Sequence, residues 1–245
     1  MVSPLSFAKV GAVKLTLVIA AALAGFNLQA TTIIATFNGE LTSESIQRDV
    51  GDGAGFVDTT TGMFTFTRTG GTQVGGPDGT FDAFCTEPRE FVSPGSSYTY
   101  DFSDLSEGAT NIGGMGVAKA DLIDELFGRY YPVIGAPIDA EHASAMQIAI
   151  WEIVREDPSN GLNVSAGIVV FQNPSDPAAL SLAQTYLSSL DGTGPRLNNL
   201  YALTAIGVQD VIVQIPEPVE SVTTGLALIA LSLMARARRH RRPLR

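Results

Sequence analysis

The stretch EHASAMQIAIWEI, Glu141–Ile153, decides how the rest of the chain is interpreted. Its residues recur at the i, i+3, i+4, i+7, i+8 and i+11 spacing of one helix face, which predicts a helix with a buried stripe. The stripe consists of Ala143, Met146, Gln147, Ile150, Trp151 and Val154. An unpaired buried amide costs on the order of 1–3 kcal/mol, so Gln147 needs a partner elsewhere in the chain.

Strand-like and helix-like segments surround this stretch in separate blocks. Strands are predicted at Thr31–Leu41, Met63–Thr69, Thr80–Thr86 and Ser97–Phe102, and the β pattern returns at Tyr201–Ile215. Helices are predicted at Val117–Tyr131, from the cap Asp139 to a point before Asp157, and from Asp176 to about Leu190. The order of strands, helices and strands predicts an α+β fold, a β-sandwich or barrel with a helical insertion. Residues 162–171 fit either a strand or irregular structure.

The N-terminal segment has the pattern of a secretory signal. Lys9 and Lys14 precede an apolar run from Leu15 to Phe26, and Ala30 is a small residue at a suitable cleavage point. This order of charge, apolar run and small residue predicts a signal peptide over residues 1–30.

The C-terminal segment holds a second apolar run, from Thr223 to Ala235. An Arg-rich end that includes Arg236, Arg238 and Arg239 follows it. The run is short for a bilayer span, but the positive-inside bias would hold its basic end in the cytoplasm. We expect a C-terminal transmembrane helix here; the alternative is a buried helix with a basic tail.

The charge of the central segment excludes one class of partner. Residues 31–218 contain 24 acidic and seven basic side chains, a formal charge of −17. Such a surface repels nucleic acid, so no nucleic-acid partner is expected. The sequence has no glycine-rich nucleotide motif and no metal-spaced Cys/His cluster, so neither a cofactor nor a metal ligand is expected.

Cysteine usage is unusual for an exported chain, because Cys85 is the only cysteine. It has no partner for an internal disulfide. The remaining possibilities are an inert buried thiol, an intermolecular disulfide, a nucleophile, or a thiol bonded to an atom other than sulfur. A thiolate that attacks a glutamine amide expels ammonia and leaves a thioester, which would account for Cys85 and Gln147 together.

The two residues also carry a family resemblance. The segment FCTEP around Cys85, followed by MQIAIWEIV from Met146, resembles the thioester domains of Gram-positive surface adhesins. The resemblance implies a Cys85–Gln147 thioester shielded by Phe84 and Trp151. It also implies that the bond reacts once, with an amine or hydroxyl of a matrix or cell-surface macromolecule, and is not a catalyst. Met146 stands where that family has a threonine, so the hydrogen bond of that hydroxyl is absent.

A second resemblance concerns the chain end. Pro216-Glu217-Pro218, the apolar run and the Arg-rich end resemble the PEP-CTERM sorting signal of Gram-negative bacteria that make exopolysaccharide. It implies processing by an exosortase and display at the cell surface or in the extracellular matrix. The expected organisation is a signal peptide at 1–30, a thioester-like domain at 31–214 and a sorting segment at 215–245.

Two alternatives remain open. In one, Cys85 and Gln147 are only packed together in a non-reactive structural protein of an exopolysaccharide matrix. In the other, Cys85 and His142 form the dyad of a hydrolase or transamidase. On an ideal helix His142 points away from Gln147, which favours a capping or surface role for the histidine.

Glu152, Arg155 and Glu156 are expected to form a solvated helix face.

Overall fold

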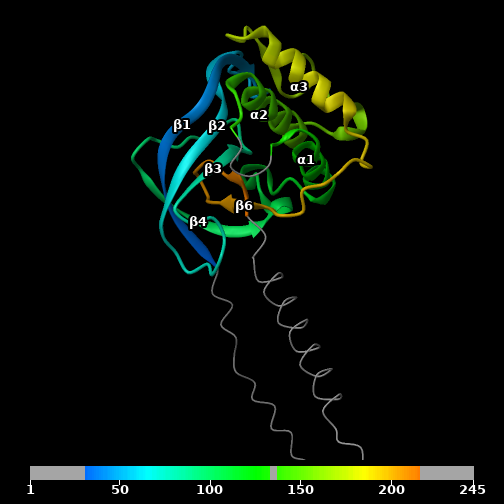
Figure 1. Cartoon of the computed structure of the whole chain (residues 1–245). Helices are drawn as coiled ribbons and strands as arrows, with labels where there is room; N and C mark the ends of the chain where they lie inside the picture. Colours follow the sequence, from blue (N-terminus) through cyan, green and yellow to red (C-terminus); the bar gives the residue numbers. More distant parts are fainter. Residues whose placement is uncertain (1–30, 133–136, 216–245) are drawn as a thin grey trace, which may run out of the picture.

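The computed structural model of the chain describes residues 31–132 and 137–215, shown in colour in Figure 1. The expected signal peptide, the Pro-Glu-Pro segment and the expected C-terminal transmembrane helix lie outside these residues. Among the residues described, no helix is both long enough and apolar enough to cross a membrane. The described chain combines one antiparallel sheet with three α-helices, which confirms the expected α+β class.

Seven strands form the sheet. They are β1 (Thr32–Asp49), β2 (Val57–Gly70), β3 (Thr80–Cys85), β4 (Ser97–Asp104), β5 (Val170–Gln172), β6 (Leu200–Thr204) and β7 (Val211–Gln214). Their order is β2-β3-β7-β6-β4-β1-β5, and β1 also pairs with β2. The sheet therefore closes into a ring, in the order β1, β2, β3, β7, β6 and β4. Strand β5 lies outside this ring and pairs with the C-terminal end of β1. This arrangement corresponds to the barrel among the expected alternatives.

Strand β1 is longer than its sequence pattern predicts. The expected strand ended at Leu41, whereas β1 continues to Asp49 and pairs with β2 along most of its length. Its register shifts on both sides of Glu40, and Gly39 there has φ 135°, a backbone conformation that favours glycine. Bulges of this kind bend a strand and redirect its side chains.

The three helices lie in the insertion between β4 and β6 and pack together beside the sheet (Figure 1). They are α1 (Val117–Tyr130), α2 (Ala140–Arg155) and α3 (Pro177–Ser189). The predicted starts of the last two helices are confirmed. The carboxylate of Asp139 accepts a hydrogen bond from the His142 N–H, and that of Asp176 accepts one from the Ala178 N–H, with Pro177 at the first helical position. The insertion also includes short 3₁₀ turns, one of them at Pro158–Asn160.

Helix α2 is buried more completely than its periodicity predicts. Every residue from 143 to 154 is buried, because α2 contacts β1, β2 and β3 as well as α1 and α3. The expectation of a solvated face at its end is therefore wrong for Glu152, whose exposed fraction is 0%. Arg155 and Glu156 are half-buried.

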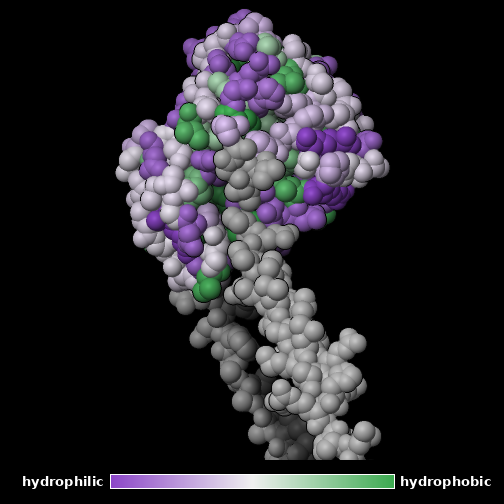
Figure 2. All heavy atoms as spheres, viewed as in Figure 1, coloured by the Kyte–Doolittle hydropathy of each residue, from purple (hydrophilic) through white to green (hydrophobic). Residues whose placement is uncertain are grey.

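On the face shown in Figure 2, hydrophobic residues are scattered in small groups among polar ones.

Candidate functional site

The structure brings Cys85 and Gln147 together. The backbone N–H of Cys85 donates to Gln147 Oε1 at 2.9 Å, and Gln147 Nε2 donates to the Cys85 carbonyl oxygen at 2.8 Å. The exposed fractions are 0% for Cys85 and 1% for Gln147. Both amide atoms that flank Cδ of Gln147 are thus bonded to the residue that carries the thiol. The acyl carbon of Gln147 therefore lies next to Cys85.

A break in the sheet explains why this helix position is a glutamine. Strands β2 and β3 pair as far as Phe64 and Ala83, and beyond that pair they separate. Alternate residues of a strand direct their N–H and C=O to the same neighbour, so Cys85 faces the side that β2 has left. The amide of Gln147 makes hydrogen bonds with Cys85 in place of a residue of β2.

A second residue of α2 bonds to the other separated strand. Ser144 Oγ, one helical turn before Gln147, donates to the carbonyl oxygen of Thr61 in β2 at 2.7 Å. Residues three apart on a helix lie on the same face, so Ser144 and Gln147 together bridge the gap between β2 and β3. The face of α2 that meets the sheet is therefore polar where the sheet is open.

The surroundings of the Cys85 thiol favour its neutral form. Burial raises the pKa of the thiol well above its ordinary value, and the carboxylate of Glu40 raises it further. A hydrogen bond with the Gln209 side chain acts in the opposite direction, and Glu87 adds a smaller increase. Because the thiolate is the nucleophile, an attack by Cys85 would require removal of its proton.

A buried carboxyl group lies close to the thiol. Burial and a hydrogen bond with the Glu90 side chain raise the pKa of Glu87 to about 7, against the lowering effect of the Asn111 and Asp210 N–H groups. The side chain of Gln209 contacts the Cys85 thiol and also donates from Nε2 to the Glu87 carbonyl oxygen at 3.2 Å. A group with a pKa of about 7 exchanges protons readily near neutral pH.

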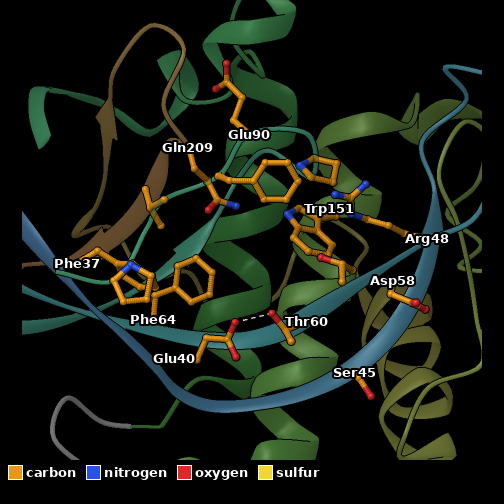
Figure 3. Close-up of a pocket in the computed structure, with 15 residues that line it drawn as sticks. Phe37, Glu40, Ser45, Arg48, Asp58, Thr60, Phe64, Glu90, Trp151 and Gln209 are labelled. Atoms are coloured by element: carbon orange, nitrogen blue, oxygen red, sulfur yellow. Dashed lines mark hydrogen bonds between the residues drawn. The ribbon is translucent and has the colours of Figure 1, made fainter. Parts of the chain in front are cut away.

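A cavity of about 680 Å³ lies in the same region, and its lining does not include Cys85 or Gln147 (Figure 3). Gln209 and Trp151 line it, so it lies against residues that contact Cys85 or neighbour Gln147 on α2. Glu40 also faces the cavity and accepts hydrogen bonds from Thr60 Oγ1 at 2.5 Å and Ser43 Oγ at 2.7 Å (Figure 3). The remaining wall includes the apolar side chains Phe37, Phe64, Phe91, Val92 and two prolines, Pro88 and Pro94.

The other residues expected at the site lie in different surroundings. Phe84 packs edge-on against Phe127 and Tyr131, with ring centroids 5.7 and 5.9 Å away. Trp151 stacks on Phe171 and borders the cavity. His142 is exposed and pairs with Asp139, whose Oδ1 lies 2.7 Å from its Nδ1. The structure thus brings Gln147, and not His142, into hydrogen-bonding contact with Cys85.

Sequence reasoning missed several residues of this region. Glu87 follows Cys85 by two positions, and its closeness could have been noticed in the segment CTEP. Glu40 and Gln209 reach the site from β1 and from the turn before β7, so no local pattern connects them to Cys85. Among the described residues, no group of three or more His, Cys, Asp or Glu side chains is placed to hold a metal ion.

Comparisons with known proteins leave the site to be interpreted from its own geometry. No protein-family model, curated protein or solved structure matches this chain.

Proposed function

We propose that the protein is a single-use acylating surface protein that forms an internal thioester between Cys85 and Gln147. The observation that supports this proposal is the paired hydrogen bonding between the Gln147 amide and the Cys85 backbone. It holds the backbone of the residue that carries the only thiol of the chain beside a buried amide carbon.

The same contacts suit the reaction that forms the bond. As Cys85 Sγ attacks Cδ of Gln147, negative charge develops on Oε1, and the Cys85 N–H already donates to that oxygen at 2.9 Å. A donor aimed at a developing oxyanion lowers the barrier of acyl transfer. The C–N bond of the amide then breaks, the S–C bond forms, and the thiol proton leaves with the nitrogen as ammonia.

We propose the cavity as the route for the second reaction, because Gln209 of its wall contacts Cys85 and Trp151 of its wall is one helical turn from Gln147. An amine or hydroxyl of a target macromolecule would attack the Gln147 acyl carbon, form an amide or ester, and return the proton to Cys85 as the free thiol. Glu40 and Glu90, which line the cavity, would attract a protonated amine and accept its proton. Trp151 at the cavity wall and Phe84, which precedes Cys85 in β3, would limit access of water to the bond. Each molecule would react once.

The proposed place of action rests on the sequence patterns of the two chain ends. A signal peptide and a PEP-CTERM-like segment would export the protein, anchor it to the membrane and present it to an exosortase. A target would then be a matrix or cell-surface macromolecule of the bacterial envelope that carries amines or hydroxyls.

Intact-mass measurement tests the proposal. The mature protein should be lighter than its sequence by one ammonia, and methylamine should add to Gln147 and release a thiol that can be titrated after unfolding. Cys85→Ser is the matched control, because the Gln147 hydrogen bonds go to the backbone of residue 85 and survive the change. A wild-type protein of full mass that forms no methylamine adduct would remove the proposal.

One alternative has a specific observation in its favour. Both polar atoms of the Gln147 amide have a hydrogen-bond partner as they stand, so the buried glutamine is accounted for without any covalent bond. A non-reactive structural protein of an exopolysaccharide matrix would have the same contacts. It differs from the first proposal in showing full mass and no adduct. A Cys85–His142 hydrolase or transamidase would instead show turnover that His142→Ala abolishes.

A further inference from the structure

Arg48 at one end of the cavity is a buried charge without a counterion in contact. Its exposed fraction is 4%, and none of the ion pairs among the described residues includes it. Its Nε also has no hydrogen-bond partner within that part of the chain. Charged side chains are rarely this buried unless they are paired, because removal of an ion from water is costly.

Two aromatic rings hold the guanidinium of Arg48 in place. Its Cζ lies 5.9 Å from the ring centroid of Phe91 and 5.9 Å from that of Trp151. Figure 3 shows Arg48 extending from β1 toward Trp151 at the edge of the cavity. Contacts with aromatic faces offset part of the cost of burial but leave the N–H donors unused. Arg48 is therefore positioned and still lacks an acceptor.

A second unused donor lies in the same place. The indole Nε1 of Trp151 is buried and has no hydrogen-bond partner among the described residues. Tryptophan N–H groups usually find an acceptor when buried. Arg48 and Trp151 both line the cavity, so the two unpaired donors belong to residues of the same cavity wall.

The charges around Arg48 do not neutralise it. Burial lowers the pKa of Arg48, the carboxylate of Asp52 opposes this effect, and the guanidinium of Arg89 adds to it. Asp52 is itself 3.5 Å from Arg89 Nε. Asp58 of the cavity wall pairs across β1 and β2 with Gln47, the neighbour of Arg48, and it accepts a hydrogen bond from Gln47 Nε2. No carboxylate of the described chain bonds to Arg48.

We propose that this end of the cavity binds a carboxylate of a ligand, with the Arg48 guanidinium and the Trp151 indole N–H as donors. The planar fork of arginine matches the two oxygens of a carboxylate. A singly charged group suits the site better than a phosphate dianion, because Glu40, Asp58 and Glu90 line the rest of the cavity. Those acidic side chains suit a ligand whose remaining part carries hydroxyls or an amine.

The binding itself does not depend on a thioester; only its role in the reaction rests on the proposed function. Trp151 is one helical turn from Gln147 on α2. A carboxylate held there would place neighbouring hydroxyls or amines of the same molecule near the Gln147 acyl carbon. The site would thus select acidic targets, such as acidic sugars, over neutral ones.

The fluorescence of Trp151, the only tryptophan in the chain, provides the test. The full chain carrying Cys85→Ala, which cannot form a thioester, is titrated with propionate and D-glucuronate. Propionamide and D-glucose are the neutral counterparts, and inorganic phosphate is the dianion, all at matched ionic strength. We expect saturable changes in emission with at least one of the two carboxylates and none with its neutral counterpart.

Variants identify the donor. Arg48→Met should weaken carboxylate binding by about tenfold or more, and Arg48→Lys, which keeps the charge but loses the fork, should weaken it by a smaller factor. Arg196→Met is the matched control, because Arg196 pairs with Asp121 at the surface, away from the cavity lining. If Arg48→Met does not fold, the comparison of Arg48→Lys with the parent decides.

Four results would overturn the proposal. They are no saturable change with either carboxylate, equal binding of a carboxylate and its neutral counterpart, unchanged affinity in both Arg48 variants, and tighter binding of phosphate. The mass measurement on the wild-type protein is independent of all four. Failure of the thioester therefore leaves carboxylate binding to stand or fall on its own result.

Discussion

Removal of the Gln147 amide should lower the free energy of unfolding more than removal of a comparable surface amide. The test is made in a Cys85→Ala background, where no thioester can form and the amide stays intact. Gln147→Met keeps a similar volume, so the cavity it leaves is small. It strips the N–H and C=O of residue 85 of their partners in a place that is 1% exposed at Gln147.

The expected loss follows from these two groups. Each buried backbone group without a partner costs about 1–3 kcal/mol, so Gln147→Met should lower the free energy of unfolding by about 2–6 kcal/mol. Total stabilities of domains are about 5–15 kcal/mol. With a urea slope of about 1–3 kcal/mol per molar, a loss of about 4 kcal/mol lowers the unfolding midpoint by more than about 1 M.

Gln184 on α3 is a matched control for this measurement. Its side chain accepts from the Val164 N–H at 3.1 Å and donates to the Leu162 carbonyl oxygen at 3.1 Å, so it too bonds one backbone N–H and one backbone carbonyl, here of two residues. Gln184 is half-exposed, so water can replace its amide, and Gln184→Met should cost less than about 1 kcal/mol. Equal losses of stability in the two variants would refute the reasoning, because the burial of the hydrogen bonds to residue 85 would then make no difference.

Three further substitutions have outcomes that the structure defines. Burial, together with the Glu156 carboxylate, raises the pKa of Glu152 from 4.5 to about 7 against the effect of the Asn163 N–H. The folded state then holds a proton that the unfolded state lacks, so stability falls as the pH rises between about 4.5 and 7. Glu152→Gln should therefore gain stability over the wild type at about pH 8 and not at about pH 5, as measured by urea unfolding at both values. Equal differences at the two values would contradict this prediction. Tyr100→Phe removes a fully buried hydroxyl that has no partner among the described residues, so it should raise stability by about 1 kcal/mol and the thermal midpoint by about 2–4 °C. A lower midpoint would mean that the hydroxyl has an acceptor. The carboxylate of Glu125, which is also fully buried, accepts from Arg129 Nε at 2.8 Å and Gly192 N at 2.7 Å. Glu125→Gln should cost about 2 kcal/mol in chemical unfolding, and an unchanged midpoint would contradict it.

Local signals predicted the helices well. Asp139 and Pro177 mark helix starts through contacts within one turn, so no distant residue is needed to interpret them. The far half of β1 was missed for the opposite reason. Its polar residues from Thr42 to Ser45 look like a loop, and they form a strand because β2 pairs with them from more than a dozen residues away.

The residues of the site were likewise predictable where a local signal marked them and not where their role depends on distant contacts. Cys85 and Gln147 each stood out from their own surroundings, one as a lone cysteine and one as a polar residue in a buried stripe, and the chemistry that could join them is known. Arg48 gave no such signal, because an arginine beside Gln47 and Asp49 resembles an ordinary surface residue. Its burial depends on Phe91 and Trp151, which reach it from distant parts of the chain.

The insertion between β4 and β6 has a consequence for the order of folding. These two strands pair directly, yet residues 105–199 separate them in the sequence. Contacts that span so many residues form slowly, because the intervening chain must first be confined. Cys85 lies in the ring and Gln147 in the insertion, so they meet only when the helices have docked on the strands. A thioester at this contact would thus form late, and its presence in a molecule would record that folding had been completed before the chain became reactive.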